Sequence, residues 1–259
     1  MIKEIFSGLK FSFGYFSILP VKFTERDDLS NKKTLKFMIL FFPLVGFVLG
    51  FLSLKIYEII DWQVPYISLL FGAISYMILY GFLHTEAVVD IVDAIYAKMA
   101  GKDAYKVIKE PGIGALGALW GFSVVIVKIG LISYLFYRGF YYQFLTIVIV
   151  SRISILFVTS FGEFKSSFVN KLKESLDFRT FLVFIFIYLF FTVLVLGWSI
   201  VWLLPFGVVM ATILYIWVKK RVGFANGDLL GFTLEVVEVV LMFVVALYEG
   251  REIICLLPS

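Results

Sequence analysis

Three acidic side chains between residues 83 and 97 have the spacing of a single chemical site. If residues 85–97 form a helix, Glu86, Asp90 and Asp93 lie at positions i, i+4 and i+7 on one narrow stripe. Carboxylates held that close repel one another, and Mg2+ is typically bound by one or two carboxylates together with substrate phosphates. The stripe therefore predicts a metal site, with a solvated acidic helix face as the alternative. His84 directly precedes the stripe and could be a base or a boundary residue.

A second acidic group lies in the segment NGDLLGFTLEVVEVV, residues 226–240. Asp228 precedes a long apolar run, and Glu235 and Glu238 follow inside it at an i, i+3 spacing that places both on one helix face. We predict these three acids as further metal ligands. The alternative is that the two glutamates pair with basic residues and hold helices together. The available partners are Lys128, Arg152 and residues 219–221.

Glycines and basic residues near the acids are suited to a phosphorylated substrate. The segment KEPGIGALG, residues 109–117, opens an apolar run, and a helix that begins there offers free N–H groups and a positive dipole end to phosphate. Close helix packing is an equally good explanation of such glycines. An arginine well inside an apolar span needs a carboxylate or phosphate partner. The predicted substrate-binding residues are Lys109, Gly114, Gly117, Arg152, Asn226 and Gly227.

The composition is that of a polytopic membrane protein. Of 259 residues, 61% are hydrophobic, 30 are Phe and 16% are charged, and the mean hydropathy is +1.00. The apolar runs are about as long as the roughly 20 residues that cross a bilayer, and they lack the alternation of barrel strands. The single cysteine, Cys255, excludes an intramolecular disulfide, and the single histidine excludes a multi-histidine metal site.

We therefore predict an all-α integral membrane protein with one domain, residues 1–259, and about seven transmembrane helices. Residues 1–20 are expected to form an amphipathic or re-entrant helix, and the acidic stripe a helix on the cytoplasmic side. Pro205 is expected to separate the fifth and sixth spans. The predicted spans cover residues 37–60, 65–84, 114–137, 141–160, 180–199, 203–218 and 232–248.

The distribution of Lys and Arg predicts the orientation of these spans. With the N-terminus on the same side as the acidic helix, that side carries 18 of the 23 Lys and Arg residues, and the opposite side carries three. Short cytoplasmic loops are rich in Lys and Arg. The acidic helix and the active site are therefore predicted to face the cytoplasm.

Several motifs, in order along almost the whole chain, resemble those of the cobalamin synthase family of adenosylcobinamide-GDP ribazoletransferases. That family carries segments close to LHLDGLADTADG, KDSRIGAFG and TGDxLGAxxExxE. This chain has LHTEAVVDIVDA at 83–94, KEPGIGALG at 109–117 and NGDLLGFTLEVVE at 226–238. A weaker FLTRLP-like element is matched by FSILP at 16–20, and a central Ser-Arg pair by Ser151 and Arg152.

The resemblance implies a Mg2+-dependent enzyme of late cobalamin biosynthesis in the inner membrane of a prokaryote. A ribose hydroxyl of α-ribazole, or of its 5′-phosphate, would attack the corrinoid-side phosphorus of adenosylcobinamide-GDP and release GMP. By position, Asp90, Asp93 and His84 match as catalytic residues. The implied metal ligands are Glu86, Asp90, Asp93, Asp228, Glu235 and Glu238. The expected partners are these small molecules and the lipid bilayer, without nucleic acid, and a homo-oligomer is left open.

The chain departs from the family pattern at several positions. Where the family has aspartates, this chain has Glu86 and Glu110, and where it has glycines, this chain has Ala87 and Ala94. The family's Ser-Arg pair is replaced by Pro111-Gly112. Loss of the arginine removes one expected phosphate contact.

Two other functions compete with this interpretation. The CDP-alcohol phosphotransferases also use a membrane acidic cluster, but their signature requires an Ala-Arg pair that does not follow Glu86. An ion or metal transporter would need acids spread through the membrane thickness.

Overall fold

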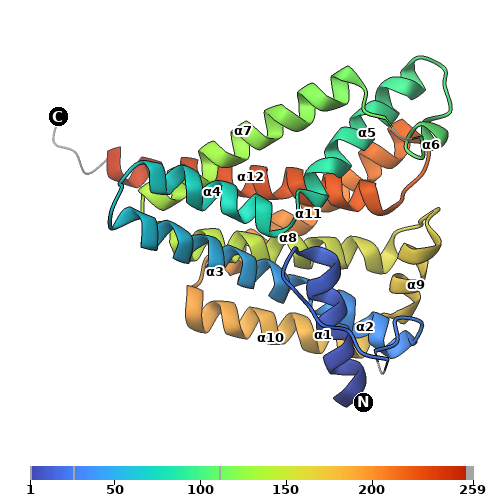
Figure 1. Cartoon of the computed structure of the whole chain (residues 1–259), viewed down its shortest axis with the longest axis horizontal. Helices are drawn as coiled ribbons and strands as arrows, with labels where there is room; N and C mark the ends of the chain where they lie inside the picture. The colour runs from blue at the N-terminus through green and yellow to red at the C-terminus, as the bar shows by residue number, and fades with distance from the viewer. Residues whose placement is uncertain (1, 26, 111, 255–259) are drawn as a thin grey trace.

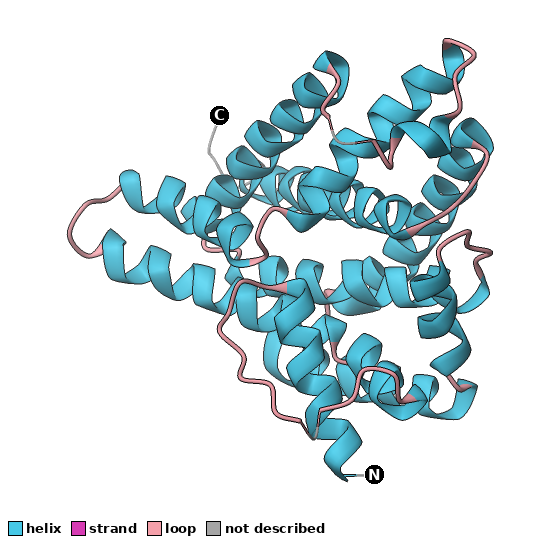
Figure 2. Cartoon of the chain, turned by 45° about the vertical axis from the view of Figure 1, so that its right-hand side comes forward, coloured by secondary structure: helices cyan, strands magenta, loops and turns pink. Residues whose placement is uncertain are grey.

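The structure is a computed structural model and describes residues 2–25, 27–110 and 112–254. Pro111 and Cys255 lie outside these ranges. Every regular element in the described part of the chain is a helix, joined by short loops (Figure 2). The helices are α1 (Ile2–Phe16), α2 (Lys32–Leu40), α3 (Phe42–Asp61), α4 (Ile67–Leu79), α5 (Leu83–Met99), α6 (Ala104–Val107), α7 (Ala115–Tyr137), α8 (Tyr141–Phe161), α9 (Ser167–Ser175), α10 (Phe178–Leu196), α11 (Ile200–Val222) and α12 (Gly227–Ile254).

Six helices are long and apolar enough to cross a membrane by themselves: α3, α7, α8, α10, α11 and α12. The pair α4 and α5 meets the same criterion only when the two are counted together, across a bend of 75°. The prediction of a polytopic all-α membrane protein is confirmed, and seven spans are reached when the bent pair is one of them. Figure 1 shows the long helices side by side, with α6 and α9 at the right-hand end.

The two ends of the bundle differ in charge. The helices α3, α7, α10 and α12 begin at one end, where the loops carry most of the Lys and Arg residues. We call this the basic end, and it lies to the right in Figure 1. The helix α1 has 15 residues, fewer than a span needs, and packs there against α2 and α3. Its Lys10 Nζ lies 2.8 Å from a carboxylate oxygen of Asp27 in the following loop.

The first predicted span, residues 37–60, is broken at its start. The helix α2 ends at Leu40, and α3 begins at Phe42 with Pro43 in its first turn. Proline has no N–H to donate and is tolerated in a first turn, where that N–H would be unpaired. The proline thus marks a new helix where the hydropathy pattern alone predicted a continuous one.

The prediction that Pro205 separates the fifth and sixth spans is wrong. The break lies at Gly197, whose φ of +94° is accessible to glycine at low cost, and α10 and α11 flank it. Pro205 lies inside α11, in its second turn. In the second turn, its ring removes one backbone hydrogen bond, a loss that membrane-spanning helices tolerate.

The last span begins earlier than predicted, at Gly227 and not at residue 232. Asn226 caps this start, because its Oδ1 accepts a hydrogen bond of 3.1 Å from Leu229 N. Asp228 is therefore in the first turn of α12, Glu235 in the third turn and Glu238 in the fourth, deeper than the sequence suggested.

The bend between α4 and α5 sets the position of the acidic stripe. Gly81 and Phe82 have φ values of +65° and +54° there, and the left-handed backbone turns the chain sharply. The helix α5 consequently packs against α7 and α12. Its Val89 lies against Gly121 of α7, and its Ala87 against Gly231 of α12. The second half of α5 therefore reaches the level at which α7 and α12 begin.

The helix α8 forms the centre of the bundle and is the most buried of the candidate spans, whereas α7, α10 and α11 leave most of their surface exposed. The exposed residues of α10 include Phe186, Phe190 and Leu194. Large apolar side chains on an outer face are expected where that face meets lipid.

Close packing at Gly72 of α4 gives a test of the bundle. A Cβ atom there would lie 2.7 Å from Tyr57 Cβ and 2.9 Å from Phe136 Cε2. We expect Gly72→Ala to destabilise the protein by about 1–3 kcal/mol through overpacking. Gly130→Ala is the matched control, because a Cβ at Gly130 has nothing within 4 Å. Thermal unfolding in detergent measures both, and equal melting temperatures for the two variants would contradict the packing.

Candidate active site

Asp93 connects α5 to the beginning of α7. Its two carboxylate oxygens accept hydrogen bonds from Gly114 N at 2.7 Å and from Gly117 N at 2.9 Å. A Cβ on Gly117 would lie 2.5 Å from Asp93 Cγ, so a side chain there would prevent this approach. The carboxylate thus occupies the positive end of the α7 dipole. These two N–H groups were assigned to phosphate from the sequence, and that role stays a prediction.

Asp90 has no hydrogen bond or ion pair among the described residues, although it is half buried. It lies on α5, the second half of the bent pair that is counted as the seventh span. The carboxylates whose charges act on Asp90 are Asp228, Glu86 and Asp93. Asp228 accepts a hydrogen bond of 2.5 Å from Asn226 Nδ2, and Glu86 is exposed. The charges of Glu86 and Asp228 act on Asp90, and that of Glu86 acts on Asp228. We call these three predicted ligands, at the basic end of the bundle, the carboxylate group.

An open cavity of about 310 Å3 adjoins this carboxylate group. Asp90 and Asp93 line it together with Lys102 and Gly114. Lys102 is exposed and can bring positive charge to an anionic substrate beside the acids. Lys109, predicted for that purpose, is also exposed, and its Nζ lies 4.4 Å from the centre of the Tyr105 ring.

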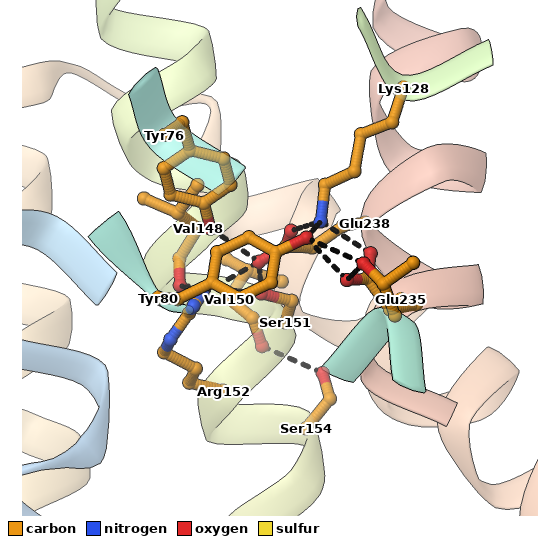
Figure 3. Close-up of polar contacts among 11 residues, drawn as sticks. Tyr76, Tyr80, Lys128, Val148, Val150, Ser151, Arg152, Ser154, Glu235 and Glu238 are labelled. Carbon is orange, nitrogen blue, oxygen red and sulfur yellow. Dashed lines mark hydrogen bonds and ion pairs between the residues drawn. The ribbon is translucent and has the colours of Figure 1, made fainter. Parts of the chain in front are cut away.

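Glu235 and Glu238 belong to a different group, closed off between α7, α8 and α12 (Figure 3). Lys128 Nζ pairs with Glu235 Oε2 and lies 2.7 Å from Glu238 Oε2. Arg152 lies 2.6 Å from the other oxygen of Glu238. All four side chains are at most 1% exposed. Two negative and two positive charges thus neutralise one another inside the bundle.

Hydroxyl groups complete this buried group, which we call the charge network. Glu235 Oε1 accepts hydrogen bonds from Tyr80 at 2.6 Å and from Thr85 at 3.0 Å. Glu238 Oε1 accepts from Tyr76 at 2.9 Å and Ser151 at 3.1 Å. The tyrosines were missed from the sequence, although their i, i+4 spacing in an apolar span is a signal for a shared polar target.

The charge network matches the alternative interpretation of Glu235 and Glu238, in which they pair with basic residues inside the membrane. Their partners are Lys128 and Arg152, whereas Lys219 pairs with Glu163 at 2.8 Å. The sequence predicted that Arg152, inside an apolar span, would need a carboxylate or a phosphate as its partner. In the structure its partner is the carboxylate of Glu238. The roles of the two glutamates as metal ligands, and of Arg152 toward phosphate, stay predictions.

His84 lies between the charge network and a second cavity. It is 5% exposed, and its ring stacks on Tyr80 with centroids 5.4 Å apart. Phe42 makes an edge contact with it at 5.9 Å. The Nε2 atom of His84 is buried and has no hydrogen-bond partner in the part of the chain that the structure describes. Gly227 and Asp228 line the same cavity as His84.

Within the described ranges, no three His, Cys, Asp or Glu side chains converge on one point as a ready-made metal cage. Mg2+ seldom needs such a cage, because it keeps several waters and takes one or two carboxylates plus substrate phosphates. Asp90 is half buried, has no cation partner among the described residues and is acted on by the charge of Asp228, so these two carboxylates fit that donor set.

Comparisons with known proteins agree on one family. The model of the family described as cobalamin-5-phosphate synthase matches residues 8–246. A Clostridium botulinum (strain Alaska E43 / Type E3) protein named adenosylcobinamide-GDP ribazoletransferase is 24% identical over 95% of this chain and 100% of its own length. A protein of that name from Chlorobaculum parvum is 24% identical over 93% of this chain and 96% of its own length. No solved structure matches.

Removal of one charge from the network should be costly. Lys128→Met leaves two buried carboxylates with one cation, and we expect a loss of about 3–5 kcal/mol in the free energy of unfolding. The double variant Lys128→Met/Glu235→Gln restores neutrality and should recover much of that loss. Lys220→Met removes an exposed lysine as control. Unfolding in detergent measures all three, and a Lys128 variant as stable as the Lys220 variant would contradict the charge network.

Proposed function

This chain belongs to the cobalamin-5-phosphate synthase family, and we propose that it acts as an adenosylcobinamide-GDP ribazoletransferase, the activity named for its relatives. The family match over residues 8–246 carries the proposal, because it includes every helix that positions Asp90 and Asp228. The carboxylate group and the adjoining open cavity at the basic end support it.

In the proposed reaction, a ribose hydroxyl of α-ribazole, or of its 5′-phosphate, attacks the corrinoid-side phosphorus of adenosylcobinamide-GDP. A new oxygen–phosphorus bond forms, the bond from that phosphorus to GMP breaks, and the hydroxyl proton is released. The products are adenosylcobalamin, or its 5′-phosphate, and GMP. Catalysis of this kind consists mainly of positioning the two substrates and stabilising charge on phosphate.

We propose that the diphosphate lies against the carboxylate group. Asp90 and Asp228 would hold Mg2+, with Glu86 nearby, and the bound ion would offset the charge of the diphosphate. Lys102 would draw the anionic substrate into the open cavity. Asp93 would act through its hydrogen bonds to Gly114 and Gly117, which fix α7 beside the site.

We further propose that the enzyme resides in the cytoplasmic membrane of a prokaryote with this site on the cytoplasmic side. The support is the concentration of Lys and Arg at the basic end, where the carboxylate group also lies.

The deeper acids do not favour transport as an alternative. Glu235 and Glu238 lie further into the membrane than Asp228, but each has a cationic partner within the charge network. A transported cation would have to displace Lys128 or Arg152 to reach them.

Release of GMP tests the proposed activity directly. The purified protein in lipid nanodiscs should release GMP from adenosylcobinamide-GDP and α-ribazole 5′-phosphate only when Mg2+ is present. Asp90→Asn should reduce the rate at least about a hundredfold, since it removes a ligand of the Mg2+ ion, and stabilisation of phosphate charge by such an ion is worth several kcal/mol. Glu174→Gln, an exposed acid on α9, is the control and should keep the full rate. A folded wild-type protein that releases no GMP would refute the activity.

Thermal unfolding tests the Mg2+ site without relying on turnover. Mg2+ that binds the folded state should raise the melting temperature of the wild type, and the rise should grow with concentration. Asp90→Asn removes one of the repelling carboxylates, so it should melt at or above the wild-type temperature without Mg2+ and respond little when the ion is added. An equal Mg2+ response in both proteins would remove Asp90 from the metal site. NaCl at matched ionic strength is the control.

A further inference from the structure

The loop after α1 runs back along that helix and forms one unit with it, which we call the N-terminal unit (Figure 2). Phe23 of the loop stacks on Phe11 of α1 with ring centroids 4.8 Å apart. Further toward the start of the helix, Asp27 accepts hydrogen bonds from Ser7 Oγ at 2.6 Å and from Lys10 Nζ at 2.8 Å. Because the loop is attached to the helix at two levels, the unit can hold whatever its end contacts.

The N-terminal unit contacts the bundle at α2 and at the bend between α4 and α5. Gly8 lies against α2, where a Cβ atom on the glycine would be 2.5 Å from Phe37 Cβ. At the bend, the backbone N–H of Ile18 donates a hydrogen bond of 2.9 Å to the carbonyl oxygen of Leu79, the last residue of α4. Carbonyls in the last turn of a helix have no partner within the helix. The bond from Ile18 therefore attaches the unit to the point where α4 ends.

Gly81 makes this close approach possible. A Cβ atom on Gly81 would lie 3.0 Å from Ile18 Cγ2, which is closer than ordinary contact. Ile18 itself is 57% exposed, so packing in the core does not explain its position. It lies in the segment FSILP, residues 16–20, one of the family-like segments, and no residue of that segment takes part in the proposed reaction. The contact with the bend is thus a role that this segment can have.

The backbone of the bend is strained at Phe82. Its φ of +54° and ψ of +12° lie in the left-handed region, which a non-glycine residue adopts only at a cost in free energy. Such a residue keeps that conformation only where its surroundings impose it. Burial of its own ring contributes little, because Phe82 is 40% exposed. Elements outside α4 and α5 supply two restraints, namely the hydrogen bonds of Tyr80 and Thr85 to Glu235 and the bond from Ile18.

We propose that Ile18 is a positioning residue, whose backbone N–H holds the bend in the conformation that presents Asp90 to Asp228. The inference deepens the proposed function and rests on it for its chemical meaning, because the group that Ile18 positions is the carboxylate group. Without the bond, Phe82 can leave the left-handed region, and α4 and α5 can straighten toward one continuous helix.

Such a change at the bend would be felt at the carboxylate group. Asp90 lies roughly 10 Å along α5 from the first residue of that helix, since an α-helix rises 1.5 Å per residue. Rotation of α5 about the bend therefore displaces Asp90 from Asp228, which belongs to another helix. A misplacement of about 1 Å can cost a hundredfold in rate. The N-terminal unit thus acts on the reaction from outside the site, through the angle of the bend.

Two substitutions at Ile18 separate its backbone bond from its side chain. Ile18→Pro removes the N–H, whereas Ile18→Ala keeps the N–H and shortens the side chain. GMP release by Ile18→Pro should fall at least about tenfold, which corresponds to the loss of one hydrogen bond. Ile18→Ala should stay within about twofold of the wild type, as expected for a substitution at the surface.

A second substitution at the strained residue should suppress the effect of the first. Asparagine adopts the left-handed conformation more readily than phenylalanine, so Phe82→Asn lowers the cost of the bend. The double variant Ile18→Pro/Phe82→Asn should therefore recover most of the rate that Ile18→Pro loses. A disturbance confined to the loop around Ile18 would not respond to a change at Phe82.

The distance between the ends of α5 and α11 gives a readout that needs neither turnover nor Mg2+. Spin labels on Lys98→Cys of α5 and Lys220→Cys of α11 occupy exposed positions, and Cys255→Ser removes the native cysteine. In nanodiscs, double electron–electron resonance should give one narrow distance for this labelled protein and for its Ile18→Ala variant. Ile18→Pro should add a second distance population, and Phe82→Asn should remove it again.

Gly81→Ala tests the same contact from the other side, which keeps the proposal testable if Ile18→Pro does not fold. Its new Cβ would press on Ile18 Cγ2, and alanine at a φ of +65° is itself strained, so a second distance population is expected. Ile18→Ala removes Cγ2 and should reduce that population in the double variant.

Three results would overturn the proposal. The first is a folded Ile18→Pro variant with the same single distance as the parent protein. The second is a second population that Phe82→Asn leaves unchanged. The third is an equal loss of GMP release in Ile18→Pro and Ile18→Ala. A wild type that releases no GMP would refute the proposed function instead, and the distances would still decide whether Ile18 holds the bend.

Discussion

The balance of two carboxylates and two cations inside the membrane is the constraint on which the rest of the structure depends. Glu238 contacts both Lys128 and Arg152, and Glu235 contacts Lys128, so α12, α7 and α8 can pack only in the arrangement that keeps these pairs together. A buried ion pair is weak evidence of stability, but loss of one partner is severely destabilising. The charge network therefore fixes how the helices lie relative to one another more than how tightly they are held.

The packing of these helices also positions the carboxylate group at the basic end. Tyr80 and Thr85 flank the bend between α4 and α5, and both donate hydrogen bonds to Glu235 of α12. The bend is thereby attached to the same helix whose first turn carries Asp228. From there α5 extends outward, so that the charge of Asp228 acts on Asp90 and Asp93 accepts a hydrogen bond at the beginning of α7. Buried neutralised charges hold the bundle, and uncompensated charges remain near its surface, where a metal and phosphates can reach them.

Hydropathy and the positions of glycine and proline made much of the fold predictable, and each wrong helix boundary has an identifiable cause. The third, fourth and fifth predicted spans agree with α7, α8 and α10 to within a few residues. A long apolar run between polar loops must form a helix in a bilayer, because its backbone groups can hydrogen-bond only with one another there. The prediction at Pro205 was wrong because a membrane-spanning helix tolerates a proline inside it, whereas Gly197 ended α10 through its positive φ. The cap of α12 by Asn226 depends on a side-chain rotamer that the sequence does not state.

The sequence alone predicted the membrane character and placed Glu86, Asp90 and Asp93 on one face of one helix, because these follow from composition and the helical period. Its motifs indicated the family. It could not decide what each face meets. The fold was needed to assign Asp93 to the start of α7 and to enclose Glu235 and Glu238 with Lys128 and Arg152. It also left Asp90 under the charge of Asp228, with no ion pair among the described residues. The physical reason is that a carboxylate's role depends on its neighbours in space, and those come from helices far away in the chain.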